Sequence, residues 1–304
     1  TMGANSNIQW TDHTFNPWWG CEKVSPGCKN CYAEAHAVTR LKLPVWGAGS
    51  ERKMFKDAHW REPLKWQADA EKAGVRARVF CASMADVFED YRGPNAKEVV
   101  TARTRLLRLI NATPNLDWLL LTKRPENVVK LWPVYSPGIQ FYSNIWIGCT
   151  IENQEQAEKR IEALLSIPAR IHFVSYEPAL ERIDLTRIKL KGEPGSHLNA
   201  LTGAITLTGG DRPVVYLPNR VTWVIVGGES GSKARECNPS WLLQVVEACQ
   251  EHKVPVFVKQ LGANPEPRTG SGWGPVRATK GDNQDEWPRC LVVREHPNTT
   301  PDSA

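Results

Sequence analysis

The segment NIWIGCTIENQEQAEKRIEALLSIPARIHFVSY (144–176) decides the fold class. It opens with an apolar run at 144–150, continues through a charged stretch with helical spacing at 152–167, and ends in a second apolar run at 170–176. Nearly continuous apolar runs are typical of parallel strands that are buried on both faces. A strand, a helix and a strand in this order predict a βαβ unit.

The same alternation extends in both directions along the chain. Further apolar runs lie at 75–83, 117–122, 221–228 and 254–260, and further helical patterns lie at 98–112 and 239–252. With HTFNPWW (13–19) as the first strand there are seven strands. They predict an α/β protein with a parallel (β/α) barrel of the TIM type, complete or partial, over residues 1–262.

Two regions depart from the barrel pattern. Residues 186–220, which follow the fifth strand, mix Gly, Pro, Leu and Thr and are predicted to form an insertion. Residues 263–304 are rich in Gly, Pro, Asn and Asp and are predicted to form an irregular C-terminal extension and tail.

The composition is that of an ordinary globular protein, with 41% hydrophobic and 23% charged residues among 304. A net charge of +5 permits an anionic partner without requiring one. The chain has no apolar run of about 18 residues and no apolar leader, so we expect no membrane partner and a cytoplasmic location. Eight cysteines in a reducing compartment predict thiols or metal ligands rather than disulfides.

Three cysteines lie close together in NPWWGCEKVSPGCKNCYA (16–33), namely Cys21, Cys28 and Cys31. Three thiolates can bind three irons of a [4Fe–4S] cluster and leave the fourth iron open to a chelating ligand. The competing interpretation is a zinc site, with His36 or Asp12 as the fourth ligand. The scattered cysteines are expected to be small buried side chains.

The cysteine cluster, followed by Tyr32-Ala33, resembles the three-cysteine signature of radical S-adenosylmethionine (SAM) enzymes, including spore photoproduct lyase. A phage- and prophage-associated, radical-SAM-like family without a settled substrate is more closely similar. The segments that carry this resemblance are WTDHTFNPWWGCEKVSPGCKNCYAE (10–34), VIVGGESGSKAREC (224–237) and VPVFVKQLG (254–262). Six residues separate the first two cysteines here and three separate them in the usual signature, and Asn30 stands where an aromatic residue is usual.

The resemblance implies reductive cleavage of SAM at the cluster to a 5′-deoxyadenosyl radical, with an electron donor such as flavodoxin or ferredoxin. It also implies that residues after successive strands contact SAM. Ser83 and Asp86 would bind the methionyl amino group and Lys123 the carboxylate, unless Lys123 is a surface residue. Further contacts are expected from Glu152 and Asn153 with the ribose, and from Glu177, Gly228 and Glu229 with SAM or substrate. Asn153 could instead cap a helix, and Gly228 could form only a tight turn.

The substrate class stays open between alternatives. Nucleic acid repair or modification is favoured by the lyase-like motif and by basic residues such as Arg187, Lys189 and Lys191. A small metabolite or nucleotide is the second candidate, and a cluster- or zinc-binding protein without catalysis is the third. The 186–220 insertion is expected either to lie against a duplex or to cover a small-molecule pocket.

Overall fold

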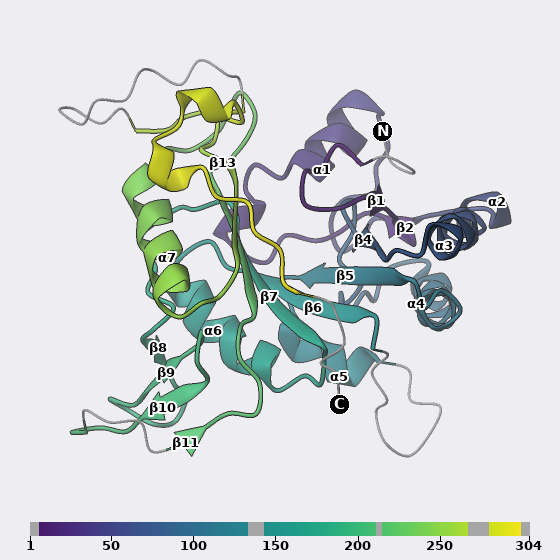
Figure 1. The fold of residues 1–304 in the computed structure, drawn as a ribbon. Coiled ribbons are helices and arrows are strands. Elements are labelled where there is room, and N and C mark those ends of the chain that lie inside the picture. The colour runs from purple at the N-terminus through teal and green to yellow at the C-terminus, as the bar shows by residue number, and fades with distance from the viewer. Residues whose placement is uncertain (1–5, 133–142, 211–214, 267–279, 299–304) are drawn as a thin grey trace. The chain divides into compact units, whose positions relative to one another are not determined.

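The computed structural model describes residues 6–132, 143–210, 215–266 and 280–298 (Figure 1). Contacts divide the chain into two compact units. Unit 1 comprises Thr1–Cys149 and Ile167–Arg170, and unit 2 comprises Thr150–Ser166 and Ile171–Ala304. Both units combine parallel strands with helices, which confirms the α/β class.

Unit 1 is built on parallel strands that pair in chain order. They are β1 (His13–Thr14), β4 (Ala77–Cys81), β5 (Leu116–Thr122) and β6 (Ile145–Thr150). Trp118, Leu119 and Ile147 are fully buried in this sheet. Their continuous burial along the strands explains the unbroken apolar runs in the sequence.

The predicted first strand, 13–19, divides into two short strands. Only His13–Thr14 joins the parallel sheet, whereas β2 (Trp18–Trp19) pairs antiparallel with β3 (Lys53–Met54). Pro17 lies between them and has no N–H to donate to a strand ladder. The prediction of one continuous strand over 13–19 was therefore wrong in its second half.

The longest helices of unit 1 are α3 (Glu62–Ala73) and α4 (Ala96–Asn111). Helix α3 contacts β4 and β5 and ends at Gly74, whose left-handed backbone is the usual helix terminator. Helix α4 buries an apolar stripe that includes Leu106 and Ile110. The short elements are α1 (Tyr32–Glu34), α2 (Asp57–Trp60), α5 (Val128–Leu131), 3-10 turns at Pro26–Cys28 and Pro125–Asn127, and a π-helical turn at Ala35–Arg40.

Unit 2 has its own parallel strands, β7 (Ile171–Tyr176), β12 (Trp223–Gly227) and β13 (Val256–Gln260), paired in this order. Its helices are α6 (Gln154–Leu165) and α7 (Pro239–Glu251). Helix α7 packs against β12 and β13 (Figure 1). It buries Leu242 and Val245.

Between β7 and β12 the chain forms a small antiparallel sheet. Its strands are β8 (Ile188–Lys189), β9 (His197–Asn199), β10 (Ala204–Thr206) and β11 (Val215–Tyr216), in the spatial order β11-β10-β9-β8. These strands lie within the 186–220 region, of which 211–214 fall outside the described residues.

The C-terminal segment returns to unit 2 along β13. Val258 N–H donates to the carbonyl of Val293, and Glu295 N–H donates to that of Val256. This pairing covers the edge of the sheet, which would otherwise offer unpaired backbone groups. The segment has 3-10 turns at Gln284–Glu286 and Arg289–Leu291, and the parts of the predicted extension at 267–279 and 299–304 lie outside the described residues. Within the described parts of the chain, none of the helices combines the length and apolarity needed to cross a membrane.

Candidate functional site

The cysteine segment is fixed to the loop that follows β4. Gly20 N–H donates to the Met84 carbonyl over 3.0 Å, and the Asn16 side chain bonds both Met84 N–H (2.7 Å) and the Ser83 hydroxyl (3.1 Å). Since β4 ends at Cys81, these bonds place Cys21 at the carboxyl ends of the unit 1 strands. This is the end where parallel α/β sheets carry their chemistry.

Gly20 is required by the space around it. Its φ of +116° is one that L side chains rarely adopt, and a Cβ there would lie 2.2 Å from the Val45 carbonyl oxygen. The same Cβ would lie 2.8 Å from Cδ of Arg52. The residue before the first cysteine therefore has to be glycine.

A buried arginine, Arg52, supports the backbone of Cys21 from the neighbouring turn. Its Nη1 donates to the carbonyls of Val45, Gly47 and Ser50, and its other nitrogens form a bidentate pair with Glu89 at 2.8 and 3.1 Å. Gly47 N–H in turn donates to the Cys21 carbonyl over 2.9 Å. Arg52 thus organises the turn on which Cys21 rests.

Arg124, which follows β5, reaches the first cysteine directly. Its Nη1 lies 3.8 Å from Cys21 Sγ and 2.9 Å from Asp86 Oδ2, and its Nη2 donates to the Glu22 carbonyl over 2.9 Å. A guanidinium beside a sulfur stabilises the thiolate form. The sequence interpretation had chosen its neighbour Lys123 and missed Arg124.

Asp86 is the hub that holds Arg124 in place. Its Oδ1 accepts from Phe88 N–H (3.0 Å) and Thr122 Oγ1 (2.7 Å), and its Oδ2 accepts from Lys123 N–H (3.1 Å) and Arg124 Nη1 (2.9 Å). A carboxylate offers about four acceptor sites, so these donors fill them. The ammonium contact predicted for Asp86 would have to displace one of these donors.

Cys28 and Cys31 lie on short helical turns beside the same loop. Cys28 ends the 3-10 turn that begins at Pro26, and Cys31 immediately precedes α1. The hydroxyl of Tyr32 donates to the Ser83 carbonyl over 2.7 Å, which ties this turn to the end of β4. Cys21, Cys28 and Cys31 are all free thiols and partly exposed.

Charged side chains near the thiols shift the thiol pKa values in opposite directions. Burial raises the pKa of Cys21 to about 12, with Asp86 and Glu89 adding to the rise and Arg124 working against it. Burial also raises the pKa of Cys31, and the charge of Lys123 counteracts it. The raised pKa values of Cys21 and Cys31 favour their protonated form, so a bound metal would have to displace these protons.

The sequence left an iron–sulfur cluster and a zinc ion as alternatives for the three cysteines. Among the described residues, no three His, Cys, Asp or Glu side chains lie close enough together to hold a single metal ion. A cubane takes one thiolate per iron, so its ligands are spread more widely than those of one zinc. Asp12, one proposed fourth zinc ligand, precedes β1 and accepts from Arg78 N–H (2.8 Å), at the opposite end of this strand from Cys21.

Unit 2 has polar side chains at its own strand ends. Lys259 Nζ lies 2.8 Å from Glu177 Oε1, although β12 separates their strands. Gly227 of β12 permits this contact, because a Cβ there would lie 2.9 Å from Glu177 Oε1. The other unit 2 residues predicted to contact SAM have partners close to them in the sequence or in space. Glu229 forms a bidentate pair with Arg235.

Three predicted SAM contacts in unit 2 have evident structural roles. Glu152 is fully buried and pairs with Arg160 at 2.8 Å. Asn153 caps α6, where its side chain accepts from Gln156 N–H over 2.9 Å. A Cβ on Gly228 would lie 2.2 Å from the Leu261 carbonyl oxygen, so close backbone packing requires glycine there.

The fold and the site define an α/β protein with parallel strands and a three-cysteine loop at their carboxyl ends. The chain belongs to the DUF5131 family, described as "Protein of unknown function", whose model matches residues 5–288. The chain matches no curated protein and no solved structure.

Proposed function

We propose that Cys21, Cys28 and Cys31 bind a [4Fe–4S] cluster and that the protein is a radical-SAM-type enzyme. Its parallel strands would form a (β/α) barrel of the TIM type, complete or partial. The observation that carries the proposal is the placement of three free, partly exposed thiols at the carboxyl ends of parallel strands, with a guanidinium beside the first. When bound, such a cluster supplies the electron that breaks the sulfonium C–S bond of SAM.

The chain's own residues would orient and shield this centre. Arg124 holds Cys21 and offsets the negative charge of the thiolates, while Asp86 fixes Arg124. The charge of Lys123 works against the raised pKa of Cys31, and its contact with the carboxylate of SAM stays a prediction. The contacts proposed for Ser83 and for the unit 2 residues stay predictions.

A group of buried apolar side chains beside the cysteines would limit the access of water to the cluster. Cys31 packs against a buried group that includes Trp19, Ala33, Val45 and Met84. Low solvent access is one of the properties by which a protein sets the potential of an iron–sulfur cluster.

Anaerobic reconstitution tests the proposal. We expect about four irons per chain, an absorbance that dithionite bleaches, and 5′-deoxyadenosine on incubation with SAM. Cys28→Ala should lose the cluster, whereas Cys290→Ala should keep it because Cys290 is an exposed thiol outside the cysteine segment. Protein that holds one zinc and no iron would overturn the cluster. Iron without 5′-deoxyadenosine would instead make this a cluster-binding protein without SAM cleavage.

The role of Arg124 has a readout that does not require turnover. Hydrogen bonds and charges near the sulfurs set the potential of a cluster. Arg124→Gln removes a positive charge beside Cys21, so the reduction potential should fall. Arg124→Lys should fall less, and Arg92→Gln, at an exposed site, should leave it unchanged. Equal potentials in all variants would limit Arg124 to a structural role.

A further inference from the structure

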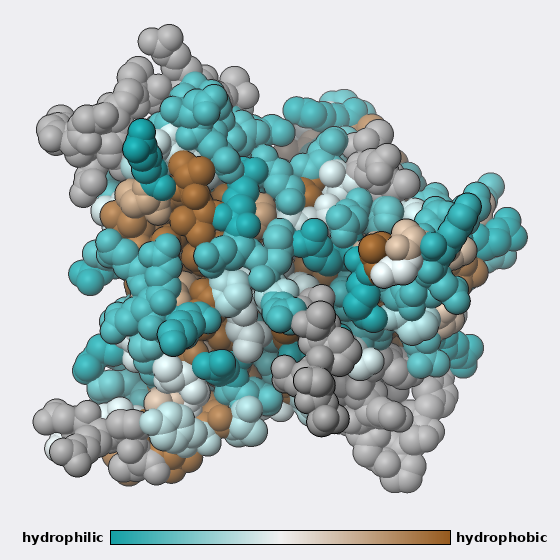
Figure 2. Space-filling model, viewed as in Figure 1, coloured by the Kyte–Doolittle hydropathy of each residue, from teal (hydrophilic) through white to brown (hydrophobic). Residues whose placement is uncertain are grey.

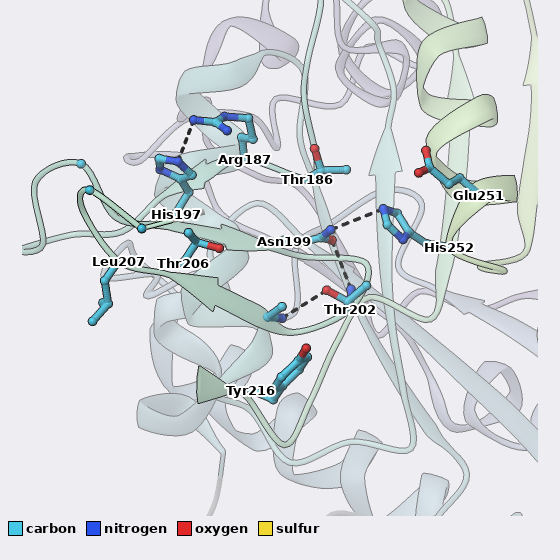
Figure 3. A pocket seen from close by; sticks show the side chains of 14 residues that line it. Thr186, Arg187, His197, Asn199, Thr202, Thr206, Leu207, Tyr216, Glu251 and His252 are labelled. Atoms are coloured by element: carbon cyan, nitrogen blue, oxygen red, sulfur yellow. Dashed lines mark hydrogen bonds between the residues drawn. The ribbon is translucent and has the colours of Figure 1, made fainter. Parts of the chain in front are cut away.

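The small antiparallel sheet of unit 2 carries a hollow of about 840 Å³ (Figure 3). This volume is in the range of small-molecule sites, roughly 300–1,000 Å³. Its principal side chains are polar or aromatic and come from the start of β8, from β9 to β11 and from the end of α7. They include Arg187, His197, Asn199, Thr206, Tyr216 and His252.

Strand alternation presents these side chains on one face. His197 and Asn199 of β9 line the hollow, while Leu198 between them is fully buried. Thr206 of β10 lies opposite His197, and Ala204 lies opposite Asn199 on one side and Tyr216 on the other. The hydrophobic side of the strands anchors the sheet, so the polar face is held firmly toward solvent.

One side of the hollow is suited to an anion. Arg187 Nη2 lies 2.7 Å from His197 Nε2, and because a guanidinium can only donate, His197 accepts there. Figure 3 shows this pair together at one side of the hollow, with Thr206 nearby. A guanidinium, an imidazole and a hydroxyl are the groups that bind phosphate oxygens.

The other side presents a fixed amide and a second histidine. Asn199 Oδ1 accepts from the backbone N–H groups of Leu201 and Thr202, which orients the amide. Its Nδ2 therefore faces His252 Nε2, at 3.4 Å. Glu251 also lies on this side, away from Arg187 in Figure 3, where it can accept from a hydroxyl or amino group.

Tyr216 supplies an exposed aromatic surface. Its side chain is 64% exposed and stands beside the small Ala204, so one ring face is open to stacking. Val215 and Leu207 of the same small sheet are also exposed, and Figure 2 shows hydrophobic atoms at the surface of this sheet. Two strand spacings, roughly 10 Å, separate Tyr216 from Asn199, and His197 lies two residues further along β9.

We propose that this hollow binds a nucleotide, either free or as part of a single-stranded nucleic acid. The phosphate would lie beside the Arg187–His197 pair, where the guanidinium has further N–H groups to donate, and the base would stack on Tyr216. Stacking on an aromatic side chain and a nearby cation are the combination that binds single strands without sequence preference. The site lies within unit 2 and does not depend on the cysteine cluster.

Binding can be measured with the whole chain carrying Cys28→Ala, so that cluster loss cannot influence it. The probes are fluorescent oligo(dT) of increasing length, titrated by anisotropy at low and moderate salt, with AMP and inorganic phosphate as competitors. We expect Arg187→Ala and Tyr216→Leu each to weaken binding about tenfold or more. Lys191→Ala, which removes one exposed charge outside the hollow, should change it less than twofold.

The competitors distinguish the two sources of the nucleotide. If AMP displaces the fluorescent probe as well as a long unlabelled oligonucleotide does at the same molar concentration, the ligand is a free nucleotide. Affinity that grows with oligonucleotide length and falls with salt indicates a strand. The proposal is overturned if neither probe binds, if inorganic phosphate competes as well as AMP, or if Lys191→Ala weakens binding as much as Arg187→Ala.

Discussion

Replacing Arg52 by methionine should destabilise the protein strongly, because the buried partners of its guanidinium would lose their hydrogen-bond donor. Its side chain is fully buried, and the change removes two bonds to Glu89 and three to the turn carbonyls of Val45, Gly47 and Ser50. Arg124 remains near Glu89 at 3.9 Å and offsets only part of the loss. Breaking a buried pair from one side costs about 3–5 kcal/mol. We expect a loss of that size in urea unfolding, with an unchanged m-value.

Two comparisons make this expectation specific. Arg92→Met removes a bidentate pair of similar geometry with Asp90, but at an exposed site, so the unfolding midpoint should hardly move. Arg52→Met combined with Glu89→Leu should recover part of the loss, since no carboxylate is then left unpaired. A single Arg52→Met variant within 1 kcal/mol of the parent protein would refute the reasoning.

Substitutions of Gly20 and Asn153, each with a comparison variant, test the structural roles of these two residues. Gly20→Ala should cost about 3 kcal/mol or more, because strain at φ +116° adds to the overlap with the Val45 carbonyl. Gly74→Ala, at φ +65° in open space, should cost only about 1–2 kcal/mol, and equal losses in the two unfolding curves would contradict the close-contact argument. Asn153→Ala should lose about 1 kcal/mol of helix capping, which Asn153→Asp should restore. If Asn153→Asp is stable but binds SAM normally, the predicted ribose contact of this amide is absent.

Much of the fold was predictable, because burial on both faces of a parallel strand leaves a local signature. The apolar runs at 117–122 and 144–150 became β5 and β6 within one residue at either end. Helix α3 was missed, although Pro63 at its start and Gly74 at its end are ordinary helix signals. Strands of two or three residues, such as β8 and β11, are too short to show any periodicity.

Site residues were predictable where they are neighbours in the sequence, as the cysteines are, or where they follow a parallel strand, as Asp86 does. The cysteines could be found because all three lie within one loop. Arg124 and Arg52 were not found, since an ion pair between loops distant in the sequence leaves no pattern in either. The cap by Asn153 could be named as an alternative because its partner, Gln156, is three residues away.

The two ends of the cysteine segment are anchored, so the position of the site does not depend on how many residues lie between the first two cysteines. Gly20 and Tyr32 are tied to the loop after β4, whereas Glu22, Lys23 and Val24 between the first two cysteines are exposed to solvent. Within this spacer the Glu22 carbonyl accepts from Arg124 and Lys23 pairs with Glu34. A solvent-exposed loop between anchored ends can lengthen or shorten at little thermodynamic cost. A sequence search that fixes the number of residues between the first two cysteines would therefore miss proteins with the same architecture and a different spacing. A search for residues equivalent to Gly20 and Tyr32, together with the loop after β4, would find them.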